Sequence, residues 1–165
     1  MENMLWKPQT LWLMCGIPGS GKSHWVQEKL ATNSGVWCSR DLIRFNLLGE
    51  NEDYFAHEDE VFEAWIAQIK KAIREGNENI YVDATHLTEK ARNKVLDRLD
   101  LKSVEVVPVA FHTPLEKCIE LNARRTGLAN VPESAIRNMY KSYKIPTMYE
   151  KHKYAAIIFP EVPNV

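Results

Sequence analysis

The chain has 165 residues, of which 45% are hydrophobic, and it carries 21 basic against 22 acidic side chains. This length and apolar content predict one compact domain over residues 1–165, and the balanced charge excludes a global field that would attract a polyanion from a distance. No segment approaches the roughly 20 apolar residues that span a bilayer, and the first residues lack the features of a signal peptide, so we expect a cytoplasmic protein with no membrane partner.

Short apolar runs alternate along the chain with segments whose apolar residues recur every three or four positions. The first kind of segment predicts strands at residues 10–15, 36–38, 79–83, 104–111 and 154–159. The second kind predicts helices at residues 22–31, 57–75, 88–99, 113–123 and after Pro132, with a further one presumed around Asp41 and Arg44. This alternation predicts an α/β fold with a mostly parallel central sheet and helices on both faces.

Three helix boundaries have specific signals. Gly76 follows the periodic pattern of residues 57–75, at the position where glycine often ends a helix. Thr88 is expected to cap the next helix through its hydroxyl. Thr113, followed by Pro114 and by Glu116, predicts a capped start for the helix after the fourth strand.

Residues 16–23 read Gly-Ile-Pro-Gly-Ser-Gly-Lys-Ser and fit the P-loop pattern G-x-x-x-x-G-K-[ST] between an expected strand and an expected helix. The glycines let the turn direct backbone N–H groups at phosphate oxygens, and the start of the following helix adds to the anion site. Lys22 is expected to bridge the β- and γ-phosphates, and Ser23 to ligate Mg²⁺. The segment therefore predicts a site for ATP, or another nucleoside triphosphate, with Mg²⁺, formed by Gly16, Pro18, Gly19, Ser20, Gly21, Lys22 and Ser23.

Two acids are expected at the carboxyl edge of the sheet, where ligands collect in open α/β folds. Asp41 lies three positions before Arg44, so the two can face one cleft as a base and an anion clamp; an aspartate in the first turn also stabilises a helix without any chemistry. Asp83 ends an apolar strand and resembles a Walker B acid, which either holds Mg²⁺ through water or orients the loop that carries Arg44. His86 nearby is interpreted as a surface or capping residue.

A locally basic segment is expected to form a helical lid at about residues 121–145. Within it, Arg124 and Arg125 precede Gly127 at a break in the helical pattern. Arginines at such a break suit closure over a phosphoryl group, where they stabilise charge and exclude water. We therefore expect Arg124 and Arg125 to contact the bound nucleotide.

Together these segments resemble the kinase domain of phage polynucleotide kinase-phosphatase and the related bacterial 5′-hydroxyl polynucleotide kinases, which are P-loop kinases in the AAA-like ATPase class. The matching segments are 16–23, Arg40-Asp41, Arg44, Asp83-Ala84-Thr85, Arg124-Arg125, Val131-Pro132 and 139–142. The resemblance implies a P-loop kinase fold in which Lys22 and Ser23 hold the donor phosphates. It also implies that Asp41 is the general base and Arg125 the lid arginine. Arg44 would grip the 3′-phosphate of the terminal nucleotide, beside Asp83 and Thr85 on the substrate side.

The chain departs from that family at several positions. His86 stands where the phage enzyme has an amide, Leu121 replaces a basic residue, and no second acid follows Asp41. Residues 157–162 resemble the approach to the phosphatase motif but lack its acids, so no phosphatase activity is expected.

Three hypotheses for function remain open. The first is an ATP-dependent polynucleotide 5′-hydroxyl kinase that phosphorylates the 5′-OH end of DNA or RNA, with Lys22, Asp41 and Arg125 as its catalytic residues. The second keeps the donor site and changes the acceptor to a small molecule, a tRNA or a zeta-toxin-like substrate. The third is a non-catalytic nucleotide-dependent switch. The sequence leaves the oligomeric state open.

Overall fold

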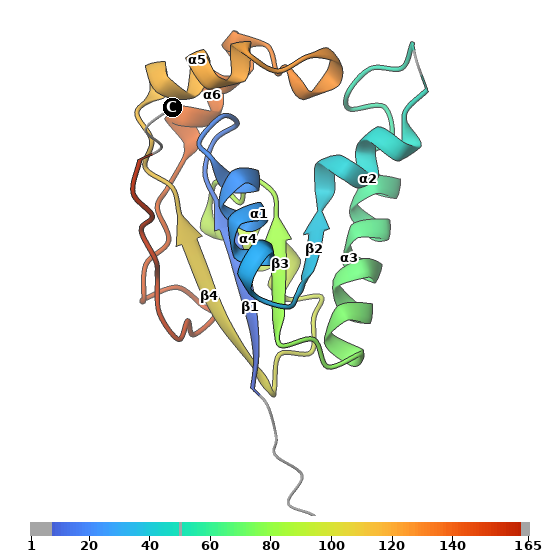
Figure 1. Ribbon diagram of the computed structural model, residues 1–165, viewed down its shortest axis with the longest axis vertical. Helices are drawn as coiled ribbons and strands as arrows, with labels where there is room; N and C mark the ends of the chain where they lie inside the picture. The colour runs from blue at the N-terminus through green and yellow to red at the C-terminus, as the bar shows by residue number, and fades with distance from the viewer. Residues whose placement is uncertain (1–7, 50, 163–165) are drawn as a thin grey trace, which may run out of the picture.

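A parallel sheet forms the centre of the computed structural model, which describes residues 8–49 and 51–162. Its four strands are β1 Gln9–Cys15, β2 Val36–Ser39, β3 Asn79–Asp83 and β4 Val104–Ala110, in the spatial order β2-β3-β1-β4. All three strand pairings are parallel, so the strands end at one common edge of the sheet (Figure 1). The α/β fold and the parallel sheet predicted from the sequence are confirmed.

Helices cover both faces of this sheet. They are α1 Lys22–Thr32, α2 Arg40–Leu47, α3 Glu58–Arg74, α4 Glu89–Leu96, α5 Leu115–Ala123 and α6 Glu133–Ser142, with a short 3-10 helix η1 at Gly127–Ala129. Figure 1 shows α1 in front of the sheet and α4 behind it, with α5 and α6 across its upper edge. In the described part of the chain, no helix has both the length and the apolar character that a membrane span requires.

The strand side chains alternate between two apolar layers. The layer covered by α3 and α4 contains Leu11, Leu13, Ile80, Val82, Trp65 and Leu96. The layer covered by α1 contains Met14, Val26, Tyr81, Val109 and Phe111. The strands therefore have continuous apolar sequences because both of their faces are buried.

Two of the three helix-boundary predictions are confirmed. Gly76 adopts a left-handed φ of 74° and its N–H donates to the carbonyl of Ile73 at 3.1 Å, which ends α3. The Thr88 hydroxyl accepts from the N–H of Ala91 at 3.1 Å and so caps α4.

The cap predicted at Thr113 is wrong. Helix α5 begins at Leu115, its N-cap residue is Pro114, and no side chain caps it. The Thr113 hydroxyl donates instead to the carbonyl of Ser20 at 2.8 Å, where both groups are buried. An unpaired buried carbonyl is costly, so the Thr113 hydroxyl bonds to the P-loop carbonyl instead of capping the helix as the local sequence predicted.

The strand predicted at residues 154–159 is also wrong. This segment lies alongside β4 and is joined to it by an isolated parallel bridge between Val109 and Ile158. The N–H groups of Ala155 and Ile158 each donate at 2.9 Å to carbonyls of β4. Pro108 in β4 has no backbone N–H, so one hydrogen bond between the two segments is missing and the pairing does not continue as a strand.

Candidate active site

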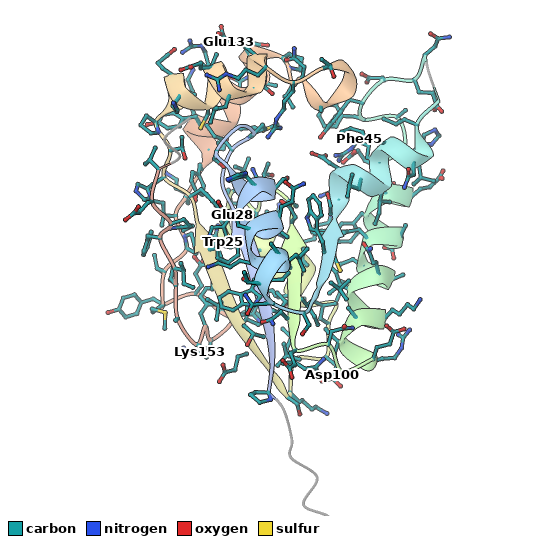
Figure 2. All side chains as sticks on the ribbon, viewed as in Figure 1. Trp25, Glu28, Phe45, Asp100, Glu133 and Lys153 are labelled. Atoms are coloured by element: carbon teal, nitrogen blue, oxygen red, sulfur yellow. The ribbon has the colours of Figure 1, made fainter. Side chains whose placement is uncertain are left out.

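A cleft of about 180 Å³ opens at the carboxyl edge of the sheet, between the P-loop and α2. Four residues predicted for the donor site line this cleft, namely Pro18, Lys22, Ser23 and Arg125. Four residues predicted for the acceptor site also line it, namely Asp41, Arg44, Asp83 and Thr85. In Figure 2, Phe45 marks α2 and Glu133 marks the start of α6, on either side of this edge in the view shown. The fold thus brings residues far apart in sequence into one cleft.

The P-loop is a tight turn in which two glycines have no substitute. Gly19 has a φ of 81°, and a Cβ there would lie 2.2 Å from the carbonyl oxygen of Cys118. Gly21 has a φ of 102° and is the N-cap residue of α1, so the turn delivers the first N–H groups of that helix to the cleft. Gly16 begins the turn, and Ser20 within it is fully buried.

Lys22 lies folded across this turn. Its ammonium donates to the carbonyls of Gly16 and Ile17, at 2.9 Å in each case, and its side chain is buried. Burial lowers the pKa of Lys22, and the carboxylates of Asp83 and Asp41 oppose that shift. A positive charge held this way favours an incoming anion, because phosphate oxygens supply the acceptors that a buried ammonium needs.

Ser23 and Asp83 meet on the floor of the cleft. The Ser23 hydroxyl donates to Asp83 Oδ2 at 3.1 Å, and the indole N–H of Trp37 donates to the same oxygen at 3.0 Å. Burial raises the pKa of Asp83, while Lys22 lowers it. Asp83 is thus paired with the P-loop serine rather than with Arg44, which favours the first of the two roles that the sequence left open.

A hydroxyl beside a carboxylate suits Mg²⁺, which prefers hard oxygen ligands and keeps several waters and phosphate oxygens around it. Among residues 8–49 and 51–162, no group of three or more His, Cys, Asp or Glu side chains could hold a metal. The cation would therefore be held by Ser23 directly, by Asp83 beside it, and by the phosphates of the nucleotide.

The acceptor side begins where β2 passes into α2. The Ser39 hydroxyl caps α2 by accepting from the N–H of Leu42 at 3.3 Å, which places Asp41 in the first turn. The Asp41 side chain is 49% exposed, whereas that of Arg44 is 5% exposed. Asp41 Oδ1 accepts a hydrogen bond from Arg44 and another, at 2.7 Å, from the hydroxyl of Tyr54. The carboxylate is therefore oriented by two donors and still faces the cleft.

Arg44 is enclosed by protein oxygens. Its Nε and Nη2 donate to Glu58 Oε1 at 2.9 and 2.7 Å, and its Nη1 donates to Asp41 and, at 2.7 Å, to Tyr54. Glu58 Oε2 also accepts from Arg40 at 3.0 Å, and the Arg40 guanidinium lies over the rings of Phe62 and Trp65. Two arginines and two carboxylates therefore form one connected network, in which the buried Nε of Arg40 has no hydrogen-bond partner among the residues described.

The two predicted lid arginines lie in different surroundings. Arg125 is half-buried and lines the cleft, whereas Arg124 is exposed and pairs with Glu120 at 2.8 Å. The Asn122 side chain exchanges hydrogen bonds of 2.7 and 3.0 Å with the backbone of Val131, which closes the connection between α5 and α6 into a loop. This loop brings Arg125 to the cleft, whereas Arg124 is not among the residues that line it.

Tyr54, Glu58 and Phe55 line the cleft but were not identified from the sequence. Tyr54 and Phe55 lie in an acidic stretch before the predicted helix at residues 57–75, and Glu58 in the first turn of that helix is explained by the helix dipole alone. The burial of Arg44, which makes a carboxylate partner necessary, appears only in the fold.

The interpretation of His86 as a surface or capping residue is wrong. His86 is 4% exposed, has a φ of 42°, and its Nδ1 lies 2.6 Å from the carbonyl oxygen of Met14. Because a carbonyl only accepts, Nδ1 carries a proton. Burial lowers the pKa of His86 to about 3.

Comparisons with known proteins agree with this geometry. Residues 11–146 match a family model described as an AAA domain. A chain in the Pnkp1/Rnl/Hen1 RNA repair complex is similar at 20% identity and a TM-score of 0.71, over 86% of this chain and 46% of that one. The present chain therefore spans less than half of that relative.

Two further structures are similar along most of both chains. Kti12 of Chaetomium thermophilum, in complex with ADP-AlF3, has 16% identity and a TM-score of 0.61, over 91% of this chain and 88% of that one. A sugar kinase from Janibacter sp. HTCC2649 has 15% identity and a TM-score of 0.59, over 92% and 85%. At these identities the likenesses show a shared P-loop kinase fold.

Proposed function

The chain belongs to the AAA_33 family of AAA domains, and from this premise we propose that it is an ATP-dependent kinase that phosphorylates the 5′-hydroxyl end of a nucleic acid. One observation carries the proposal: the P-loop residues Lys22 and Ser23 share a single cleft with the carboxylate of Asp41. A phosphoryl donor and a proton acceptor that face the same space are the minimum for transfer to an alcohol.

The donor end binds the triphosphate. Backbone N–H groups of the P-loop and of the first turn of α1 contact the phosphates, and Lys22 exchanges its two carbonyl partners for phosphate oxygens. Mg²⁺, when bound, neutralises charge on the transferring group. Arg125, at the opposite wall, adds positive charge and excludes water as the lid closes.

The acceptor end activates the hydroxyl. Asp41 takes the proton as the 5′-oxygen attacks the γ-phosphorus, the bond from that phosphorus to the bridging oxygen breaks, and ADP leaves. Arg44 and Tyr54 hold the carboxylate in place throughout. Positioning and electrostatics account for most of the catalysis in such a reaction, since little covalent chemistry falls to the protein.

Two lines of support favour a nucleic acid acceptor. The motifs at 16–23, 40–44, 83–85 and 124–125 follow the order found in polynucleotide 5′-hydroxyl kinases. One of the similar structures is an RNA repair complex that includes Pnkp1. The near-zero net charge of the chain restricts any nucleic acid contact to a few units near the end.

A small-molecule acceptor is the second candidate, and the size of the cleft favours it. A cavity of about 180 Å³ holds little more than one sugar-sized unit beside the phosphates, and a sugar kinase is among the similar structures. Under this alternative, Asp41 and the donor end act in the same way, and only the acceptor changes.

The deciding experiment is transfer of label from γ-³²P ATP with Mg²⁺. Single-stranded DNA and RNA oligonucleotides with a 5′-hydroxyl are expected to acquire label that a phosphatase removes, while matched 5′-phosphorylated strands acquire none. Lys22→Ala serves as the blank. Label on a polyol or sugar but on no oligonucleotide would replace the first candidate by the second. Nucleotide binding without transfer to any acceptor would instead favour a switch.

A further inference from the structure

The resemblance to polynucleotide kinases implies that Arg44 grips a phosphate of the acceptor, but four of its five N–H groups already donate to protein oxygens. All three guanidinium nitrogens donate to protein oxygens, and the side chain is 5% exposed. The Tyr54 ring also covers its face, with 4.2 Å from Arg44 Cζ to the ring centroid. A phosphate could reach Arg44 only by displacing these partners.

The charges around Arg44 oppose such a displacement. Asp41 and Glu58 flank it directly, and Glu58 links it to Arg40 at 3.0 Å. Two positive and two negative groups leave no net positive charge at this end of the cleft. An acceptor phosphate placed here would lie beside two carboxylates, and like charges at hydrogen-bonding distance repel.

The same contacts define what Arg44 does instead. Arg44 and Tyr54 both donate to Oδ1 of Asp41, and Oδ2 has no hydrogen-bond partner among residues 8–49 and 51–162. One carboxylate oxygen is therefore used to orient the group, and the other is left to take a proton. Glu58 fixes Arg44 through two hydrogen bonds to a single oxygen, so the orientation of Asp41 depends on α3.

We propose that Arg44 and Tyr54 are positioning residues for Asp41, and that the acceptor is a 5′-terminal nucleoside unit recognised by its ring rather than by its 3′-phosphate. This inference rests on the proposed function and specifies its substrate class. It replaces the phosphate clamp that the resemblance implied.

Phe55 is the surface that such a ring would contact. It lines the cleft, is 55% exposed, and packs edge-on against Tyr54, with ring centroids 4.7 Å apart at 80°. An exposed ring beside an oriented base is suited to stack a nucleobase, which tolerates any sequence because each base has a flat face. Asp41, Arg44, Tyr54 and Glu58 at this end are hydrogen-bonded to one another.

The first test changes the acceptor and leaves the protein intact. Two 5′-hydroxyl oligonucleotides of one sequence are compared, with a phosphodiester or an uncharged methylphosphonate at the first linkage. Wild-type kcat/KM is expected to differ by less than about threefold, since no charge-assisted hydrogen bond is lost. A loss of about tenfold or more on the methylphosphonate, abolished by Arg44→Ala, would establish the clamp and overturn the inference.

The second test separates positioning from binding. Tyr54→Phe is expected to lower kcat by about tenfold with both oligonucleotides and leave their KM unchanged. Tyr140→Phe, at an exposed tyrosine of α6, is the matched control. An unchanged kcat, or a KM that rises together with a loss of kcat, would remove Tyr54 from this role.

The third test addresses the ring. Phe55→Ala is expected to raise KM by about tenfold for both oligonucleotides, the scale of one base stacked on an aromatic side chain. Phe159→Ala is the control, because Phe159 is equally exposed at 54% and lies outside the cleft. An unchanged KM for Phe55→Ala would overturn recognition by the ring. If neither oligonucleotide is labelled by wild-type protein, the proposed function itself fails and the inference fails with it.

Discussion

The two ends of the cleft are built in different ways. The donor end is made mainly of backbone from one continuous segment, residues 16–23, and its shape is fixed by glycines that local sequence reveals. The acceptor end is made of side chains from α2, the segment before α3 and the start of α3, joined by hydrogen bonds across 10 to 14 residues. Donor chemistry is therefore readable from a motif, whereas acceptor choice depends on which distant side chains pair.

Removing the donor cation is expected to have the largest effect. Lys22→Ala is expected to reduce transfer by about three to five orders of magnitude, because a single cation on the transferring phosphoryl group acts on that scale. Lys29→Ala, an exposed lysine on the same helix, is expected to leave the rate unchanged. Initial rates of label transfer provide the measurement. A Lys22→Ala rate above a tenth of wild type would contradict the role of the P-loop.

Removing the base comes next and tests the acceptor end alone. Asp41→Asn is expected to lower kcat by about two to four orders of magnitude, with ATP affinity changed by less than about threefold. Asp59→Asn, at an exposed first-turn position of α3, controls for loss of a surface charge. Equal loss of transfer and of ATP binding, measured by calorimetry, would assign Asp41 to the fold rather than to the chemistry.

Substitutions of the two adjacent lid arginines are expected to have smaller effects on kcat, and one of the two serves as the control for the other. Arg125→Ala is expected to lower kcat by about ten- to hundredfold, because its charge adds to that of Lys22 and the metal. Arg124→Ala is expected to cost less than about threefold, because Arg124 is held outside the cleft by Glu120. Comparable losses for both variants would show that the closed lid differs from the arrangement described.

The smallest expected effect concerns stability and the region between the two ends. His86 bonds to β1, which carries the P-loop, and its ring centroid lies 5.6 Å from that of Trp65 on α3. Its folded pKa of about 3 lies below the unfolded value of 6.5, so the unfolded chain binds more protons between these values. Stability from this group is complete above pH 6.5 and declines as pH falls toward 3.

His86→Asn tests this linkage, since asparagine tolerates a positive φ. Between pH 7 and pH 5, the wild type is expected to lose about 2 kcal/mol more unfolding free energy than the variant. Urea titrations at the two pH values measure the difference. Equal losses in the two proteins would mean that His86 is protonated in the folded state.

The sequence predicted the donor end of the cleft more completely than the acceptor end. The parallel sheet, the P-loop and the place of Asp41 were predictable because apolar runs, glycine spacing and the carboxyl-edge rule are local or topological. Tyr54 and Glu58 were not predictable, because their roles arise only when α3 packs beside α2 and a buried guanidinium needs partners. Thr113 and His86 were misread for a related reason: tertiary hydrogen bonds to Ser20 and Met14 replaced the local roles assigned to them.

A crystal structure with Mg²⁺ and a non-hydrolysable ATP analogue tests the central claim most directly, namely that donor and base face each other across one cleft. The account predicts the γ-phosphorus between the Lys22 ammonium and the Asp41 carboxylate, with Oδ2 of Asp41 open toward it. A triphosphate seated in the P-loop whose γ-phosphate points away from Asp41, with protein filling the space between them, would contradict the account.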